Sequence, residues 1–434
     1  MPTPKPTSLS IRSYQVGFGD SFLLTFHYPK VAGKTKDVHI LVDCGSTGMP
    51  AAATYSLDDI AQQIATDCGG KLDAVIATHR HADHINGFAT NAAGDNSGDT
   101  LAKLKPELVV QPWTEDPALA PDAIKPTGKT SGKVKALAAH TRGLQAMHAC
   151  AALAAEEATR LGSALPERTR KQLAFLGETN LANLSAVKNL MTMGKKNEYL
   201  SYGKKTDLTK LLPGVKIHVL GPPTPADYSD IKKQRDKDKD EFWHLLGATA
   251  RQPQKARSPF DKKFAARTRP AHARWFAQRV TAAHIQQRLE IVRALDDAMN
   301  NTSLILLFEV GGKKFLFPGD AQIENWNYAL KDAPEAEANC KLLAATDFYK
   351  VGHHGSLNAT PKTLWKLFAK KGAPTKKTTL TTVVSTMSGK HGSTASNTEV
   401  PRATLVAELE KNSVFFTTQR IKKPPLFEKK DFPL

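Results

Sequence analysis

The sequence predicts an α/β protein with a layered core. Short apolar runs bounded by glycine recur along the chain, a segment with helical spacing lies between two of them, and similar runs return toward the C-terminal end. The 434 residues are 41% hydrophobic and 24% charged, which argues against disorder and against a fibrous protein. No run of about 18 apolar residues occurs, so no transmembrane segment is predicted.

The N-terminal part alternates strand and helix signals. Residues 8–28 form short apolar runs broken by Gly17 and Gly19, and residues 38–45 form a further run that ends in glycine. Residues 57–68 place apolar side chains at helical spacing, and residues 72–79 form another buried strand. This strand–helix–strand order indicates the α/β core.

Two helix-rich blocks interrupt this pattern before it resumes. We expect them to be helical insertions at about 115–212 and 226–298, because the first is Ala-rich and the second has an amphipathic, strongly charged sequence. Residues 301–320 then read as a hairpin around Gly311-Gly312. Later strand and helix signals are followed by a basic, Pro-containing tail, 422–434, which we expect at the surface.

The net charge is +18, and residues 1–110 alone carry −2, so the whole positive excess follows residue 110. Such a field attracts polyanions, including nucleic acid, an acidic membrane surface or a phosphorylated substrate. A lysine-rich surface without a specific partner is the alternative. The amphipathic insertions could also dock a partner protein, although a core or lid role is the more common one for such helices. The oligomeric state is left open.

The cysteines and the N-terminus favour a cytoplasmic protein. The chain has four cysteines that are far apart in sequence and form no C-x-x-C pair, which is typical of a reduced compartment. The first residues show no apolar stretch after their basic positions, so no secretory signal is predicted.

The strongest chemical signal is the segment His79-Arg80-His81-Ala82-Asp83-His84. It offers four metal-compatible side chains directly after a predicted strand. In an extended turn His79 and His81 point the same way and can bind one ion, while Asp83 and His84 can reach a second ion. Imidazole and carboxylate suit zinc, manganese or iron, and the absence of cysteine argues against a structural zinc site.

Two more predicted strands end in residues of the same kind. Asp320 follows one strand and the pair His353-His354 follows another. Since functional sites of α/β sheets collect at strand ends, we expect these side chains to join the first cluster.

These motifs resemble the metallo-β-lactamase fold, whose H-x-H-x-D-H signature is matched by residues 79–84. Within that superfamily the chain is most similar to the hydrolase domain of the ComEC-type DNA-uptake competence proteins. The matching segments are collinear: 16–24, 41–46, 78–88, 300–321, 348–356 and 381–409. The resemblance implies a four-layer αββα sandwich, formed by a single domain over 1–434 with the two helical insertions inside it.

The resemblance also implies residue roles. His79 and His81 would bind one divalent metal ion, Asp83 and His84 the other, and Asp320 would bridge the two. His354 would complete the second site, His353 would face the substrate, and Asp43 would support the metal-binding loop without binding metal itself. Catalytic roles are expected for Asp83, His353 and His391, the last as a substrate contact or an acid.

Two departures from the family limit what the resemblance implies. Many members have a further histidine ligand where this chain has Asn301, so Asn301 could be a weak ligand or a substrate contact, which would favour manganese over zinc. ComEC-type proteins carry a membrane channel that this chain lacks, so a role in DNA uptake is not implied. His218 is expected to be an ordinary strand residue.

The predicted function is a phosphodiesterase or nuclease. Two ions would activate a water molecule to attack a nucleic-acid backbone, and the positive charge would attract that backbone without reading its sequence. One alternative is a small-molecule hydrolase acting on an ester, lactone or phosphoester beneath a helical lid. Another is a non-enzymatic interaction module with structural metals.

Overall fold

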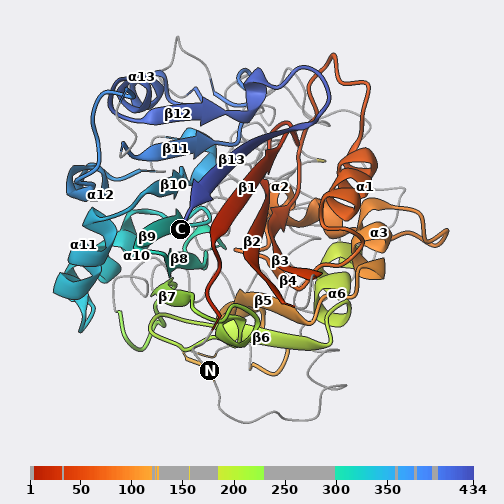
Figure 1. The fold of residues 1–434 in the computed structure, drawn as a ribbon, viewed down its shortest axis with the longest axis horizontal. Helices are drawn as coiled ribbons and strands as arrows, with labels where there is room; N and C mark the ends of the chain where they lie inside the picture. Colours follow the sequence, from red (N-terminus) through yellow and green to blue (C-terminus); the bar gives the residue numbers. More distant parts are fainter. Residues whose placement is uncertain are drawn as a thin grey trace, which may run out of the picture.

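The structure, a computed structural model, is a mixed α/β protein with two β-sheets and several helices (Figure 1). It describes residues 4–31, 34–119, 184–228, 299–356, 360–375, 379–392 and 399–434, with four isolated positions between 120 and 183. None of the helices in these ranges combines the length and the apolar character that crossing a membrane requires.

The first sheet has seven strands. Their order is β13 (Phe427–Pro433), β1 (Ser8–Tyr14), β2 (Ser21–Val31), β3 (Lys34–Cys44), β4 (Ala74–Ile76), β5 (Leu108–Pro112) and β6 (Lys196–Leu200). The pairs from β13 to β3 are antiparallel, whereas β3, β4, β5 and β6 run parallel to one another.

The second sheet has six strands. Their order is β12 (Val414–Thr417), β11 (Thr381–Val384), β10 (Phe348–Lys350), β9 (Lys313–Phe317), β8 (Ile305–Val310) and β7 (Lys216–Gly221). Strands β9 to β12 are parallel, and β8 and β9 form the hairpin expected from the sequence. In both sheets, therefore, several neighbouring strands end at the same edge.

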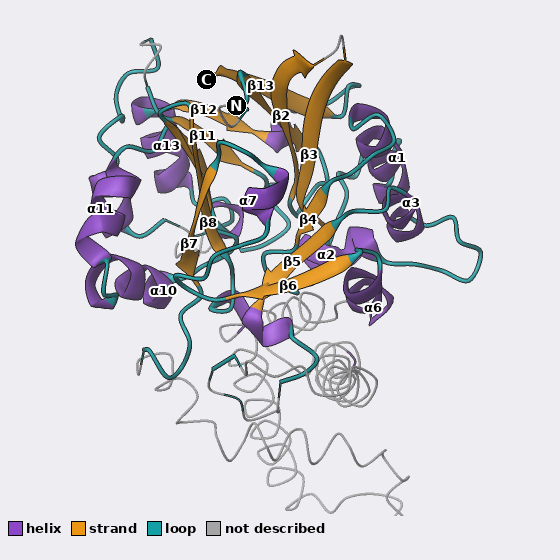
Figure 2. Ribbon diagram, turned by 60° about the horizontal axis from the view of Figure 1, so that its bottom comes forward, coloured by secondary structure: helices purple, strands orange, loops and turns teal. Residues whose placement is uncertain are grey.

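The helices lie mainly outside the sheets. They are α1 (Leu57–Asp67), α2 (Ala82–Ile85), α3 (Ser97–Lys103), α6 (Leu184–Thr192), α7 (Leu208–Leu211), α10 (Ile323–Asn327), α11 (Ala336–Ala344), α12 (Lys362–Leu367) and α13 (Ala403–Asn412). Figure 2 shows α1, α3 and α6 beside the first sheet and α10, α11 and α13 beside the second. Helix α1 matches the predicted helix, and the Ser56 side chain caps its N-terminus.

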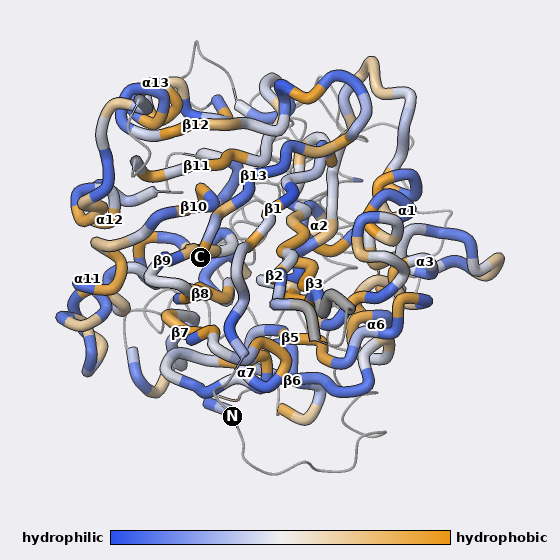
Figure 3. Tube along the Cα trace, in the orientation of Figure 1, coloured by the Kyte–Doolittle hydropathy of each residue, from blue (hydrophilic) through white to orange (hydrophobic). Residues whose placement is uncertain are grey.

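The alternation of side chains along the strands builds three apolar clusters. Phe22, Leu24 and Phe26 of β2 join Phe308 and Phe317 in one cluster that contains residues of both sheets. The intervening side chains of the two sheets point the other way, into two clusters with the outer helices. Figure 3 shows the hydrophobic residues recurring along the strands. The rings of Phe22 and Phe317, 6.0 Å apart, join the sheets directly.

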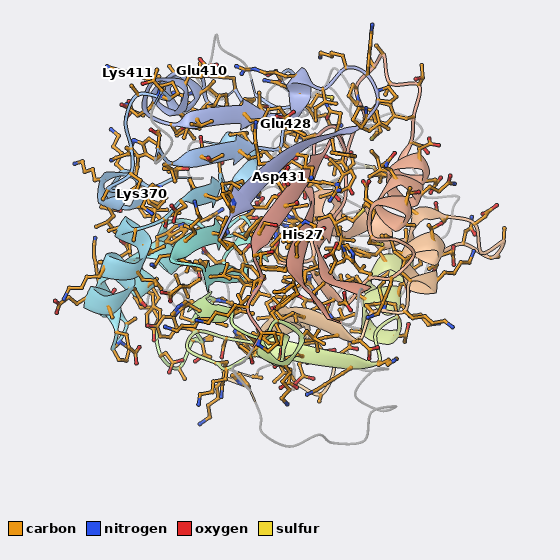
Figure 4. All side chains as sticks on the ribbon, viewed as in Figure 1. His27, Lys370, Glu410, Lys411, Glu428 and Asp431 are labelled. Atoms are coloured by element: carbon orange, nitrogen blue, oxygen red, sulfur yellow. The ribbon has the colours of Figure 1, made fainter. Side chains whose placement is uncertain are left out.

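The C-terminal tail contains a strand that the sequence analysis did not predict. Residues 422–425 are exposed, as expected, and residues 427–433 form an edge strand paired with β1 along its whole length. The Ser10 side chain of β1 links the strands on either side. Its Oγ donates to Asp431 Oδ1 of β13 at 2.5 Å and lies 2.8 Å from His27 Nε2 of β2. Figure 4 labels Asp431 and His27 on these strands.

The boundaries of the predicted insertions also differ from the structure. Strand β6 lies within the range 115–212 that we expected to be helical, and it pairs with β5 as part of the first sheet. Most of residues 120–183 and all of 229–298, where most of the two predicted helical insertions fall, lie outside the described residues.

Replacing Phe317 with Ala should lower the free energy of unfolding by about 3–5 kcal/mol, because it opens a cavity between the two sheets. Ile323→Ala is the matched control, since Ile323 is 48% exposed, and it should change stability by no more than about 0.5 kcal/mol. Urea denaturation of both variants measures the difference. Equal losses would mean that Phe317 does not hold the sheets together.

Candidate metal centre

The segment after β4 is held in place by Asp43, the residue before the last one of β3. The backbone N and the Oγ1 of Thr78 both donate to the Asp43 carboxylate at 2.7 Å. His84 Nδ1 lies 2.8 Å from Asp43 Oδ2. Asp43 therefore fixes the start of the segment and orients the His84 ring so that its Nε2 faces away from the carboxylate.

Glycine allows this close packing. Gly45 lies against the backbone of α2, and a Cβ at this position would be 2.5 Å from the backbone N and C of His84. Any side chain would therefore push β3 and the histidine segment apart.

Four side chains from distant parts of the chain meet at this point. Asp83, His84, Asp320 and His354 are buried, and each offers one ligand atom within 4.8 Å of the others. His84 Nε2 lies 3.2 Å from Asp320 Oδ2, and His354 Nε2 lies 2.9 Å from Asp83 Oδ2. The parallel strands β9 and β10 deliver Asp320 and His354 to the same edge.

His79 and His81 lie directly beside this group. His79 Nε2 is 3.0 Å from His81 Nδ1, and the rings of His79 and His84 are 4.1 Å apart at their centroids. Both residues are buried. The structure thus brings together all six residues that the sequence marked as candidate metal ligands.

The backbone at the histidine pair is strained. His353 and His354 have φ angles of 41° and 50°, a left-handed conformation that costs non-glycine residues on the order of 1–3 kcal/mol each. The backbone N of His353 donates to Asp320 Oδ1 at 2.8 Å, which partly offsets this cost. In this conformation His354 Nε2 lies against Asp83, and His353 Nδ1 has no hydrogen-bond partner among the described residues.

Buried charges of opposite sign balance in the centre. Burial by itself would lower the pKa of His84, but the carboxylates of Asp320, Asp43 and Asp20 outweigh it and raise that pKa well above its usual value. Burial would likewise raise the pKa of Asp320, but His84 and Lys350 lower it well below normal. The lowered pKa keeps the Asp320 carboxylate ionised, as cation binding requires.

The donor set fits divalent metal ions. It combines imidazole and carboxylate groups and contains no thiol, which is a set that zinc and manganese accept. Asp83 Oδ1 is buried without a hydrogen-bond partner among the described residues, so the hydrogen-bonding capacity of the cluster is not filled by its own members. Such an orphaned oxygen is a reason to expect a further ligand there.

Two buried charged residues of the centre escaped the sequence analysis. Asp20 precedes β2 and Lys350 ends β10, and the two form an ion pair. The sequence did carry a signal for Lys350, because a lysine stands within the apolar strand that leads into the histidine pair. Charged side chains in buried strands need a partner, and here the partner is distant in sequence.

The remaining candidates occupy other positions. The Nδ2 of Asn325 donates to the Asn301 carbonyl and to its Oδ1 at 2.9 and 3.1 Å. The ring of His391 packs against the ring of Phe18, with 4.3 Å between the ring centroids. The same Phe18 ring also packs against His354, at 4.4 Å between centroids. His218 is a residue of β7, as expected, and lies 3.0 Å from Glu309.

Neighbouring Asn300 differs from Asn301. It is 1% exposed, and neither of its side-chain polar atoms has a hydrogen-bond partner among the described residues. Its loop touches the centre, since Leu304 N donates to the Thr78 carbonyl and Asp320 N donates to Ser303 Oγ.

Comparisons with known proteins add little to this picture. No protein-family model matches the chain, and no curated protein matches its sequence. Among solved structures, a long form RNase Z from yeast is similar over 25% of this chain and 15% of that chain, with 19% sequence identity and a TM-score of 0.16. A similarity this weak supports no conclusion about fold or function.

Gly45→Ala should disturb the centre, because its methyl group would collide with the His84 backbone. We expect a loss of about 1–3 kcal/mol in the free energy of unfolding, as for other overpacked sites, and fewer bound metal ions per chain. Gly372→Ala is the matched control, since a Cβ there meets nothing within 4 Å. Denaturation and metal analysis of both variants test this. Unchanged metal content in Gly45→Ala would contradict it.

Proposed function

We propose that this chain is a metal-dependent hydrolase of the metallo-β-lactamase fold, acting as a phosphodiesterase or nuclease on nucleic acid. One observation carries the proposal: six candidate ligands from three separated segments lie together at the strand ends. They are His79, His81, Asp83, His84, Asp320 and His354. The likeness of the motifs to ComEC-type hydrolase domains supports the same assignment.

The arrangement of the sheets supports a four-layer αββα sandwich. One apolar cluster contains residues of both sheets, and two further clusters join each sheet to its own helices. The described strands that flank each long gap are neighbours in a sheet, since β5 pairs with β6 and β7 pairs with β8. This supports a single domain over 1–434 with insertions rather than separate domains.

In the proposed centre, Asp83, His84, Asp320 and His354 would hold one ion, and His79 and His81 would hold a second together with Asp320. Zinc or manganese, when bound there, supplies Lewis-acid chemistry toward water and phosphoryl oxygens. Asp43 orients His84 from behind. His353 would use its free Nδ1 to contact the substrate.

His391 is better suited to positioning than to acid catalysis. Burial, followed by the nearby Lys390, lowers the pKa of His391 to about 3, so its ring is neutral at pH 7. A neutral imidazole can hydrogen-bond a substrate, but it has no proton to spare for a leaving group.

The charge distribution supports a polyanionic substrate. The positive excess lies entirely after residue 110, while the segment that contains the histidine signature is slightly acidic. The described cysteines Cys44, Cys68 and Cys340 form no disulfide, which fits the cytoplasmic location that we propose.

Burial of the centre favours a second candidate, a small-molecule hydrolase. The six candidate ligands are at most 3% exposed. An enclosed site suits a lactone, thioester or small phosphoester better than a polymer backbone.

The decisive assay compares substrates with one purified preparation. Full-length protein supplied with Mn²⁺ or Zn²⁺ should cut single- or double-stranded DNA or RNA, and a chelator should abolish the cutting. Cleavage of a lactone or thioester without cleavage of nucleic acid under any metal condition would favour the second candidate. No hydrolysis of either kind would favour the non-enzymatic alternative.

Asp320→Ala should reduce hydrolysis by at least about 10²-fold, since it removes a charge at the centre of the ligand group. Asp332→Ala is the matched control, because Asp332 is exposed, and its rate should equal that of the wild type. Circular dichroism of both variants shows whether the fold persists. Full activity in a folded Asp320→Ala variant would contradict the proposed centre.

A further inference from the structure

Lys350 is a buried positive charge inside a site proposed to bind cations. It is 2% exposed and ends β10, three residues before the histidine pair. Its Nζ forms an ion pair with Asp20, lies 3.6 Å from Asp320 Oδ1, and donates to the Gly319 carbonyl at 3.3 Å. The ammonium group therefore stands between two carboxylates, one of which is a candidate metal ligand.

Asp20 is fixed on the other side of this ammonium group. Its backbone N donates to the Asp83 carbonyl at 2.9 Å, and its carbonyl accepts from Gly45 N at 3.0 Å. Its carboxylate is 0% exposed and lies 3.7 Å from His84 Nδ1 and 3.6 Å from His354 Nδ1. The Asp20 carboxylate thus lies near the Nδ1 atoms of two candidate ligands, His84 and His354, and near the Lys350 ammonium group.

The contacts define a competition for Asp320. An ammonium group 3.6 Å from Asp320 Oδ1 repels a divalent ion at that carboxylate, and burial strengthens the repulsion. Asp20 opposes this effect, because it pairs with the same ammonium group more closely than Asp320 does.

We propose that the Lys350–Asp20 pair sets the metal affinity of the centre, with Asp20 holding the Lys350 ammonium group away from Asp320. This inference rests on the proposed metal centre and assigns both residues positioning roles. Removal of Asp20 frees Lys350 to approach Asp320 more closely than 3.6 Å, so metal binding weakens. Removal of Lys350 abolishes the repulsion, so metal binding tightens. Removal of both charges brings the affinity back toward its original value.

A double-mutant cycle tests this on the full-length chain. The variants are Asp20→Asn, Lys350→Met and the two combined, and the Kd for Mn²⁺ and Zn²⁺ is measured by competition with a chromogenic chelator. We expect Asp20→Asn to raise the Kd at least about tenfold and Lys350→Met to lower it by a similar factor, as the Coulomb energy of a buried pair allows. The combined variant should lie within about threefold of the wild type.

The controls separate this role from simple structural support. Lys350→Arg keeps the charge and should leave the Kd near the wild-type value. Asp347→Asn and Lys370→Met break an ion pair of 2.6 Å elsewhere, with Lys370 labelled in Figure 4, and should not change the Kd. Unfolding of each variant in EDTA reports stability alone. If Lys350→Met does not fold without metal, Asp20→Asn and the combined variant still decide the question.

The outcomes are distinct. Opposite shifts in Kd for the two single variants support the proposal. Shifts in the same direction, or a loss of stability with no change in Kd, overturn it and leave the metal centre standing. A wild-type chain that binds neither ion overturns the proposed function and, with it, this inference.

Discussion

The structure depends on the burial of four carboxylates, Asp20, Asp43, Asp83 and Asp320, in a small volume at the strand ends. Like charges in the interior are strongly unfavourable unless opposite charges and hydrogen bonds compensate for them. Here the compensation comes from His84, His354 and Lys350.

The two sheets make this convergence possible. Parallel strands deliver the residues that follow them to a common edge, and the first sheet contributes the histidine segment after β4 while the second contributes Asp320 and His354. The aromatic contacts between the sheets, such as Phe22 with Phe317, keep the site-bearing edges of the two sheets next to each other. The same contacts that stabilise the core therefore position the site.

The centre also shows how a protein maintains unfavourable local geometry. The left-handed backbone at His353 and His354 would relax in an isolated peptide. It persists because His353 N is bonded to Asp320 and His354 is held between Asp83 and the Ser385 carbonyl, 3.0 Å from its Nδ1. Strain of this kind is typical of functional sites, and here it coincides with the candidate ligands.

The sequence by itself determined the α/β class, the helix at α1, the β8–β9 hairpin and the candidate ligands. Local patterns carried this information, because strand and helix periodicity and the spacing of residues 79–84 are visible without any long-range contact. It did not reveal that residues 427–433 complete a sheet, since their partner strand lies at the other end of the chain. Nor did it reveal the Lys350–Asp20 pair, whose members are 330 positions apart. Only the tertiary structure decides such pairings, because burial and charge compensation are properties of the folded interior and not of any segment.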